Sequence, residues 1–342
     1  MFTHLHVASA YSAHYGVTRP EYLVEAASAL GFSALAITDR GGLYGAVRHI
    51  GACMQVGLSP IVGVELEYDG GHVVVLAHGG NGGLGWKSLC RLVSAYQKGK
   101  WSLVGLQNCT VLLGADLPFA QAAMRGERAL ALSLLRDLNS SLVGVAVAVE
   151  VVSLLTEPGS LNSSLHAKRL VELADAAGLP AVLTNAVRYL TPDDALTADV
   201  LDSARFLLPL GSVSLQPNAQ AWLKSETLMQ SLALEICGDA GRAKKLLDAT
   251  SLLASRCVLS PVTDCGWGKP KTPEKALLGI DGDPFQVLQA KVDAGLDWRY
   301  PGLSGRKLLD VRHRLNKEMM TIHQLGFSTY FLTVADVAQM IR

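Results

Sequence analysis

The chain has 342 residues, of which 49% are hydrophobic and 18% are charged, and its 30 acidic and 30 basic residues leave no net charge. This length and composition exclude a disordered chain and predict one or two packed globular domains. The balanced charge excludes an overall field that would draw the chain to nucleic acid or to an anionic membrane, so any DNA contact must be local.

The cysteines and the N-terminus favour a cytoplasmic protein without a membrane partner. The six cysteines are scattered with no Cys-x-x-Cys pair, which is typical of reduced thiols rather than of a disulfide framework or a zinc ribbon. The first residues lack the basic start and apolar core of a secretory signal. The longest apolar run, Leu142 to Val152, is too short to cross a bilayer and is interpreted as a buried strand.

Short apolar strands alternate with helices along the first half of the chain. A helix is expected from Pro20, with Thr18 as its N-cap and Gly31 as its end. Further strands are expected at 35–38, 60–66, 72–77, 110–113, 142–150 and 181–185, and helices at 43–56, 85–97, 117–138 and 161–177. With the opening segment this gives about seven strands, and the alternation predicts a parallel sheet or barrel with helices outside.

The second half is predicted to be helical, with helices at 194–207, 225–237, 240–256, 284–295, 305–325 and 331–341. The segment 263–283 contains several Gly and Pro residues and is predicted to be a linker. The expected organisation is a first domain at 1–262, made of a barrel at about 1–192 and a helical extension at about 193–262, then the linker, then a last segment at 284–342.

The opening run His4 to Ser12 contains the first candidate site. Side chains two residues apart on an extended segment point to the same side, so His4 and His6 could converge on one metal. The alternative is a polar pair at the mouth of a sheet. A second polar run, Thr38 to Gly45, begins with Asp39 at the end of an expected strand, where barrel enzymes place their chemistry.

These two runs resemble the opening of the polymerase and histidinol phosphatase (PHP) domain, where they usually read His-Leu-His-x-His-Ser-x-Tyr-Ser and Thr-Asp-His-Gly-x-Leu-x-Gly. Near the other end, the run 318–332 contains Gly-Phe-x-x-Tyr-Phe-Leu and resembles the segment leading into the palm of bacterial DNA polymerase III alpha subunits and their error-prone relatives. The resemblance covers essentially the whole chain. It implies an α/β fold, a distorted seven-stranded PHP-type barrel followed by the first palm helices.

The resemblance also implies a metal site that has lost most of its ligands. PHP domains that hydrolyse phosphate esters hold two or three cations in a cluster of His, Asp, Glu and sometimes Cys. The residues that still match this pattern are His4, His6, Asp39, Glu65 and His72. The positions that depart from it are occupied by Ala8, Tyr15, Arg40, Ala115, Ala186 and Arg188.

Arg40 and Arg188 stand where the family has histidines, and a guanidinium group stays positively charged. We therefore expect both arginines to oppose metal binding and to pair with Asp39 and Glu65, leaving a vestigial, metal-free site with a structural role. If a metal does bind, the expected ligands are His6, Asp39 and Glu65. The alternative is that Asp39 is a turn residue and Glu65 an edge polar residue.

A glycine run, an apolar run and a cationic run remain to be explained. The run Gly79 to Gly85 precedes a helix but lacks the Gly-Lys-Ser/Thr ending of a phosphate loop, so a flexible turn is expected. Tyr330, Phe331, Leu332 and Val334 are expected to lack packing partners. Four cations of one expected helix could touch a DNA backbone, although a solvated helix face explains them as well: Arg306, Lys307, Arg312 and Arg314.

The resemblance implies the N-terminal part of a DNA polymerase III alpha-type subunit for DNA replication or error-prone repair. In that family the phosphate-cradling loop and the Asp-x-Asp pair that holds Mg²⁺ follow the palm hallmark, beyond Arg342, so no catalytic residue and no cofactor are expected in this chain. The expected partners are the remainder of the polymerase chain, DNA through the full-length protein, and accessory subunits. The alternatives are a stand-alone PHP metal-dependent phosphoesterase or 3′-5′ exonuclease, and a truncated, non-catalytic interaction module.

Overall fold

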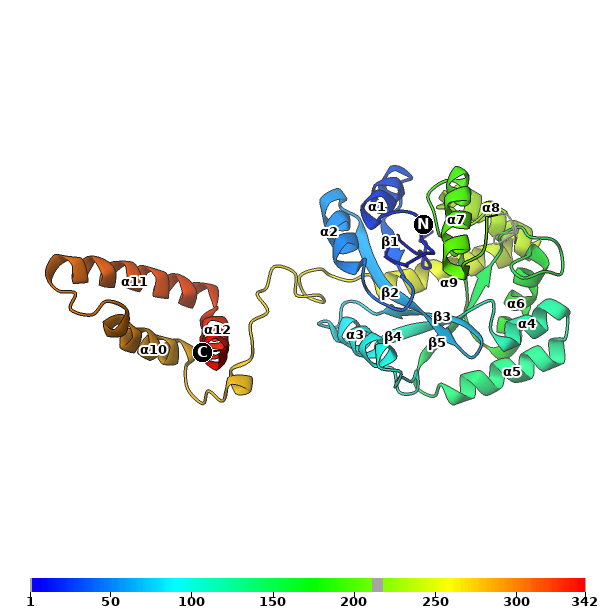
Figure 1. The fold of residues 1–342 in the computed structure, drawn as a ribbon. Coiled ribbons are helices and arrows are strands. Elements are labelled where there is room, and N and C mark those ends of the chain that lie inside the picture. The colour runs from blue at the N-terminus through cyan, green and yellow to red at the C-terminus, as the bar shows by residue number, and fades with distance from the viewer. Residues whose placement is uncertain (1, 211–217, 342) are drawn as a thin grey trace. The chain divides into compact units, whose positions relative to one another are not determined.

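A computed structural model describes residues 2–210 and 218–341 of the chain. The chain forms two compact units, Met1–Trp267 and Gly268–Arg342 (Figure 1). The division between them falls inside the segment expected to be a linker.

The first unit is built on a curled sheet whose six strands follow one another in space in chain order. They are β1 (Ala34–Ile37), β2 (Ser59–Tyr68), β3 (Gly71–Ala77), β4 (Cys109–Leu113), β5 (Ala146–Val152) and β6 (Ala181–Thr184). The pairs β1–β2, β4–β5 and β5–β6 are parallel, whereas β3 is antiparallel to both of its neighbours. The sheet is therefore mixed and not parallel throughout.

The reversal at β3 comes from the two residues between β2 and β3. Asp69 and Gly70 both have positive φ angles, of 47° and 74°, and they connect the paired residues Tyr68 and Gly71. Two consecutive residues with positive φ form the tight turn that suits an antiparallel hairpin, while a parallel connection needs a long crossover.

The helices of the first unit surround this sheet (Figure 1). They are α1 (Pro20–Ala29), α2 (Ala46–Val56), α3 (Leu84–Gln97), α4 (Pro118–Arg125), α5 (Arg128–Ser141), α6 (Ser164–Ala177), α7 (Ala195–Phe206), α8 (Glu226–Cys237) and α9 (Ala240–Cys257). The N-cap of α1 is Arg19 and not Thr18, because Pro20 occupies the first helical turn, where its missing N–H costs nothing. β5 begins four residues later than expected, since residues 142–145 form a turn closed by a Val145 N–H bond to the Leu142 carbonyl.

The opening segment takes the place of the expected seventh strand. Its carbonyls at His4 and Val7 accept hydrogen bonds from β1 and from Thr38 directly after it. On the other side, the Ala8 N–H donates to the carbonyl of Val187, just after β6, and the Val187 N–H donates to the His6 carbonyl. The segment thus lies between the first strand and the chain that follows the last one, and it closes the curl of the sheet. It is too irregular to count as a strand, so six strands are formed and not seven.

Side-chain alternation gives the sheet two faces. One face packs against α9 through small and branched residues, namely Ala36, Ile61, Val74, Leu112, Ala148 and Val182 from the strands and Leu253, Ala254 and Cys257 from the helix. The opposite face contributes to the larger core that includes α1, α2, α3 and α6. Helix α9 covers only part of the first face of the sheet. Positions on the uncovered part of this face can therefore hold polar side chains.

The second unit contains a short 3₁₀ turn (Lys275–Leu278) and three helices, α10 (Pro284–Arg299), α11 (Gly305–Leu325) and α12 (Ser328–Ile341). Its small core includes Leu288, Met319 and Leu332. Leu332 is thus buried, contrary to the expectation for this run, whereas Tyr330, Phe331 and Val334 are exposed as expected. Across the described residues, none of the helices combines the length and apolarity that a transmembrane segment requires.

Candidate functional site

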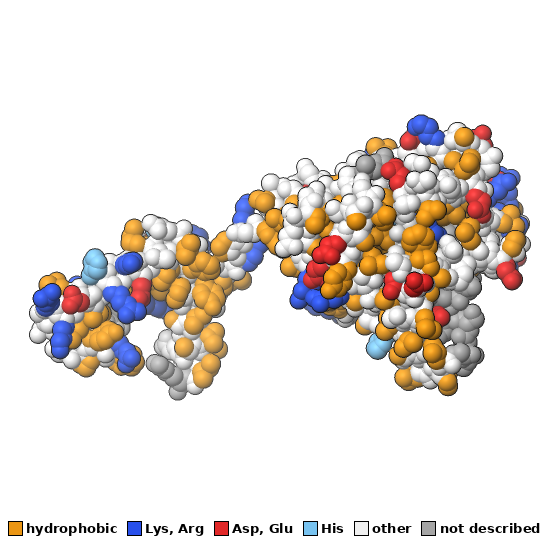
Figure 2. Space-filling model, turned by 90° about the horizontal axis from the view of Figure 1, so that it is seen from above, with side chains coloured by type: hydrophobic (Ala, Val, Ile, Leu, Met, Phe, Trp, Pro, Cys, Tyr) orange, Lys and Arg blue, Asp and Glu red, His pale blue; other side chains and the backbone are white. Residues whose placement is uncertain are grey.

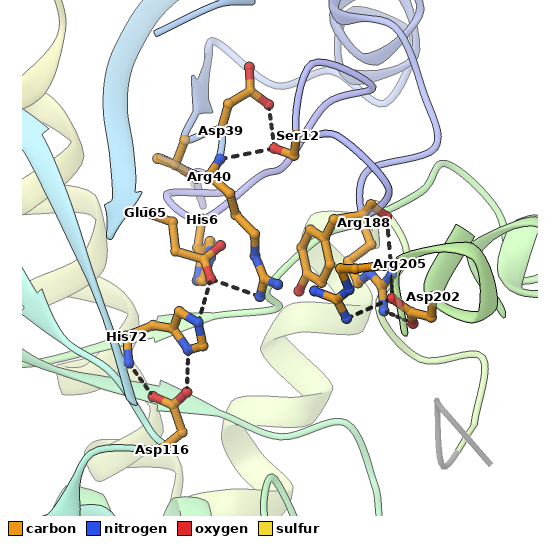
Figure 3. Close-up of polar contacts among 12 residues, drawn as sticks. His6, Ser12, Asp39, Arg40, Glu65, His72, Asp116, Arg188, Asp202 and Arg205 are labelled. Carbon is orange, nitrogen blue, oxygen red and sulfur yellow. Dashed lines mark hydrogen bonds and ion pairs between the residues drawn. The ribbon is translucent and has the colours of Figure 1, made fainter. Parts of the chain in front are cut away.

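Charged side chains converge where β2, β5 and β6 approach their ends and β3 begins. Alternation along the strands puts Glu65 on the same face as Ile61, and Glu150 on the same face as Ala148. These charged residues line one small cavity of about 150 Å³ with neighbours from the opening segment and from the loops. We call the following group the His6 cluster: His6, Arg40, Glu65, His72, Asp116 and Glu150. Figure 3 labels its members other than Glu150.

His6 lies at the centre of this cluster, between two carboxylates. Its Nδ1 is 2.7 Å from Glu150 Oε1 and its Nε2 is 3.2 Å from Glu65 Oε2. Burial opposes the charged imidazolium, but the neighbouring Glu150 and Glu65 carboxylates outweigh it and raise the pKa of His6 well above 6.5. His6 therefore holds a proton on each ring nitrogen and donates both.

Glu65 is the most heavily used carboxylate of the cluster. Arg40 Nη2 lies 2.8 Å from Glu65 Oε1, as predicted from the sequence, and the backbones of the two residues form a parallel bridge. Burial works against the charged form, yet His6 and then Arg40 hold the pKa of Glu65 down at about 2. The carboxylate is thus charged and compensated on both oxygens.

Asp39 does not pair with an arginine, which corrects the expectation for this residue. Its carboxylate accepts hydrogen bonds from the Ser9 N–H and from the hydroxyls of Ser9 and Ser12, over 2.7–3.1 Å. The Ser12 hydroxyl also accepts from the Arg40 N–H, at 3.0 Å. Burial raises the pKa of Asp39. Asp39 therefore fastens the opening segment to the end of β1, and the serines of the first motif are its partners.

Arg188 also has another partner than expected. Its two terminal nitrogens donate to the two carboxylate oxygens of Asp202 on α7, both at 3.0 Å, and one also donates to the Tyr15 carbonyl. Arg205 joins the same carboxylate at 2.8 Å. The Tyr15 ring lies between the guanidinium groups of Arg40 and Arg188, 3.3 and 3.8 Å from the ring centroid. The ring thus links the His6 cluster to the Arg188–Asp202 pair.

His72 joins the cluster through Asp116. Its Nδ1 is 2.5 Å from Asp116 Oδ2, and its Nε2 is 3.9 Å from Glu65 Oε1. The hydrogen bond to Asp116 raises the pKa of His72 against the effect of burial.

His4 does not take part in the site. Its Nε2 bonds to the Lys224 carbonyl at 2.8 Å, and its ring packs edge-on against Phe2 and Phe32. Burial lowers the pKa of His4 to about 4, so the ring is neutral at pH 7. The expected convergence of His4 and His6 fails because the segment is not a regular strand: Leu5 and Val7, two residues apart, belong to different apolar clusters.

The histidine and carboxylate contacts do not fit a bound cation. A ligating histidine must be neutral and must offer a free nitrogen, while both nitrogens of His6 lie against carboxylate oxygens. The guanidinium of Arg40 occupies an oxygen of Glu65 that a metal would need. Among the described residues, no group of three or more His, Cys, Asp or Glu side chains is arranged to hold a metal ion.

The profile of the PHP domain family matches residues 4–116, and we call this stretch the PHP domain. Over 377 residues it is 28% identical to an error-prone DNA polymerase of Symbiobacterium thermophilum, covering 100% of this chain and 32% of that protein. Over 365 residues it is 30% identical to the DNA polymerase III subunit alpha of Escherichia coli K12, covering 99% of this chain and 30% of that protein.

The chain therefore spans about a third of the length of the curated relatives that it matches. The resemblance deduced from the two end motifs is confirmed, because the similarity extends over the whole chain. Among solved structures, a two-domain protein with a predicted PHP-like metal-dependent phosphoesterase from Bacteroides vulgatus matches with a TM-score of 0.35 and 14% identity, covering 55% of this chain and 52% of that one.

Three residues of the site were not predicted from the sequence. Glu150 was visible only as an acid inside an apolar run, and a charged residue in a buried strand is itself a signal, because burying it alone is costly. Asp116 directly follows Ala115, and its role follows only from its contact with His72. Asp202 lies on a helix after the barrel, and no sequence pattern pointed to it.

The glycine run of the PHP domain is held in place and is not a free turn. The Asp264 carboxylate accepts hydrogen bonds from the N–H groups of Gly80, Gly83 and Ser260, at 3.1, 3.0 and 2.8 Å. Two amides of the loop that could have faced a phosphate are thus directed at a carboxylate of the chain itself. The negative charge of Asp264 at these amides disfavours a phosphate there.

Proposed function

We propose that this chain is the N-terminal part of a DNA polymerase of the alpha-subunit or error-prone type, and that its PHP domain supports the polymerase as a metal-free scaffold. The observation that carries the proposal is the position of Arg40, whose guanidinium lies 2.8 Å from Glu65 in the His6 cluster. A fixed positive charge at that oxygen stabilises the carboxylate in place of a metal and supplies no activated water.

The second unit supports the connection to a larger polymerase chain. On α12, side chains of Tyr330, Phe331, Val334 and Val337 are 44–49% exposed and lie within a single helix, and Figure 2 shows hydrophobic side chains gathered on this unit. Such a surface is typical of a segment that packs against further protein. In our proposal the palm covers it, and DNA synthesis with Mg²⁺ takes place in the cytoplasm on residues outside this chain, together with DNA and accessory subunits.

Metal analysis of the purified chain tests the structural role. After equilibration with Mn²⁺, Zn²⁺ or Fe²⁺ and removal of free ions, we expect far less than one ion per chain by elemental analysis. The same samples should release no nitrophenol from p-nitrophenyl phosphate and no nucleotide from a single-stranded oligonucleotide. One equivalent of metal that disappears in Glu65→Gln, together with hydrolysis, would instead establish the chain as a PHP phosphoesterase or exonuclease.

A further inference from the structure

One stretch of the sequence has a charge of a single sign. From Gly70 to Ala115 there is no Asp or Glu, although the chain as a whole contains 30 acidic residues. The same stretch contains four residues with permanent positive charge, Lys87, Arg91, Lys98 and Lys100. A neutral chain therefore has one local region that attracts anions.

Helix α3 places these cations along one groove. Lys87 and Arg91 are four residues apart on one side of α3, Lys98 is the C-cap residue of the helix, and Lys100 follows just beyond it. They line an open groove of about 570 Å³ together with Trp86, Cys90, Ser94 and Ala95. No acidic side chain contributes to its walls.

The four cations have no counter-charge in the part of the chain that the structure describes. None of them forms an ion pair there, whereas other surface cations do, such as Arg48 with Glu21 at 2.9 Å and Lys244 with Asp248. All four side chains are exposed, and their charges do not stabilise the fold through ion pairs among the described residues.

Trp86 gives the groove an aromatic wall. It packs partly against the core and lies partly in the open beside Lys87. Proteins that bind single-stranded nucleic acid combine a cationic groove that follows the phosphates with aromatic rings that stack on bases. An acidic peptide would use the cations but would have no use for a flat ring.

We propose that the α3 groove binds single-stranded DNA, with its cations on the phosphates and Trp86 as a stacking surface. The proposal rests on the proposed function only for the choice of DNA, since the chemistry of the groove belongs to this chain alone. It assigns to the PHP domain a contact with the displaced or template strand that lies apart from the His6 cluster.

Binding of a fluorescent oligothymidylate of about 20 nucleotides to the 342-residue chain tests the proposal by anisotropy at several salt concentrations. We expect the parent to bind, and the double variant Lys87→Glu, Arg91→Glu to bind at least about tenfold more weakly. The slope of log affinity against log salt should also fall, by about 0.7 for each phosphate contact that the variant loses. The matched control Arg128→Glu, Lys168→Glu makes the same charge change on α5 and α6 and should bind like the parent.

Three further variants test the stacking role of Trp86 and the contribution of the α11 cations. Trp86→Leu should weaken the single strand about fivefold or more and leave duplex binding unchanged, and Trp86→Phe should restore most of the loss. Thermal unfolding of each variant checks that the first unit is folded. Arg306→Glu, Arg312→Glu tests the rival cations on α11.

The proposal is overturned if the parent chain does not bind the oligonucleotide, or if the α11 variant loses binding while the α3 variant keeps it. It is also overturned if poly-glutamate competes as well as the oligonucleotide, because the groove would then be a site for acidic peptides. None of these results would bring a metal into the His6 cluster, so the scaffold role is tested separately.

Discussion

Tyr15 lies between two guanidinium groups, and this position makes the ring a structural link. Removing its π face in Tyr15→Leu leaves Arg40 and Arg188 close together with no negative surface between them. We expect the free energy of unfolding to fall by about 2 kcal/mol, since each partly desolvated cation–π contact contributes up to about that amount. Urea denaturation measures the change. Tyr15→Phe keeps the ring and should stay within about 0.5 kcal/mol of the parent.

Arg40 can be exchanged for the histidine that the PHP motif has at this position. Arg40→His removes the permanent positive charge beside Glu65 and supplies an imidazole that can bind a metal ion. We expect the variant to bind Mn²⁺ or Zn²⁺ more tightly than the parent in calorimetric titration, by about tenfold or more, because the like-charge repulsion is gone. The control Arg48→His makes the same exchange in the surface pair with Glu21 and should leave metal affinity unchanged. Equal affinities in all three proteins would show that the charge of Arg40 does not control metal binding.

The His6 cluster makes stability depend on pH. The pKa of His6 is above 6.5 in the folded chain, so its proton stabilises the fold fully below pH 6.5 and this contribution is lost as the pH rises through the folded value. The pKa of Glu65 is lowered from 4.5 to about 2, so its contribution is present above pH 4.5 and is lost as the pH falls towards 2. The cluster is therefore most stabilising between about pH 4.5 and 6.5.

We expect the free energy of unfolding to fall as the pH rises above 6.5. The variant His6→Gln should reduce this slope and cost about 3 kcal/mol at pH 6, because two buried carboxylates lose their partner. Urea denaturation at each pH gives the values. His49→Gln is the matched control, since burial lowers the pKa of His49 to about 4 and that ring does not titrate in this range. A slope that is equal in the parent and His6→Gln would show that His6 is not the titrating group.

The residues of the cluster could be predicted only in part. Motifs supplied His6, Glu65 and His72 of the cluster, and Asp39 beside it, because their positions are fixed by short segments at strand ends. The pairing of Arg188 with Asp202 could not be predicted, since α7 joins the barrel through contacts that no local pattern encodes.

At the scale of elements, the loop between β3 and α3 depends on Asp264. Gly83 has a φ of 83°, and a Cβ there would lie 2.4 Å from the Asp264 carbonyl oxygen, so the loop and the 260–264 turn pack directly on each other. We expect Asp264→Ala to cost about 3 kcal/mol, because one buried and two partly buried N–H groups lose a charged acceptor. Hydrogen exchange at Gly80 and Gly83 should rise before global unfolding does.

Asp239→Ala is a matched control for this change. The Asp239 carboxylate also accepts a backbone N–H, from Arg242 at 2.8 Å, but only as the N-cap of α9. Its loss should cost about 1 kcal/mol and leave exchange in the 79–83 loop unchanged. If both substitutions cost the same and neither opens the loop, Asp264 is an ordinary turn residue.

Element types followed well from periodicity, whereas strand direction and closure did not. Apolar runs identified all six strands, because buried strands need Val, Leu and Ile on both faces. The antiparallel β3 was encoded in two residues, Asp69 and Gly70, which were not considered as a hairpin signal. Closure by the opening segment depends on long-range backbone bonds from β1 and Val187, which leave no periodic pattern in the segment itself.

At the scale of the whole molecule, the two units differ in how completely they bury their apolar side chains. The first unit has a continuous core around its sheet, while the second has a core of a few residues and a helix with an exposed apolar surface. The division into Met1–Trp267 and Gly268–Arg342 agrees with this difference. Stability of the chain should therefore be concentrated in the first unit.

The exposed surface of α12 leads to a prediction about association. Phe331 and Val334 are exposed by 44% and 49%, and exposed apolar side chains gathered on one helix favour contacts with further protein. We expect the parent to self-associate at micromolar concentration, as measured by light scattering after size exclusion. The double variant Phe331→Glu, Val334→Lys should be monomeric, with unchanged unfolding of the first unit. Val143→Glu, at a residue 76% exposed on the first unit, is the control and should associate like the parent. A parent that is monomeric throughout this range would argue against a partner surface on α12, because an uncovered apolar helix face of this kind should drive contacts between copies.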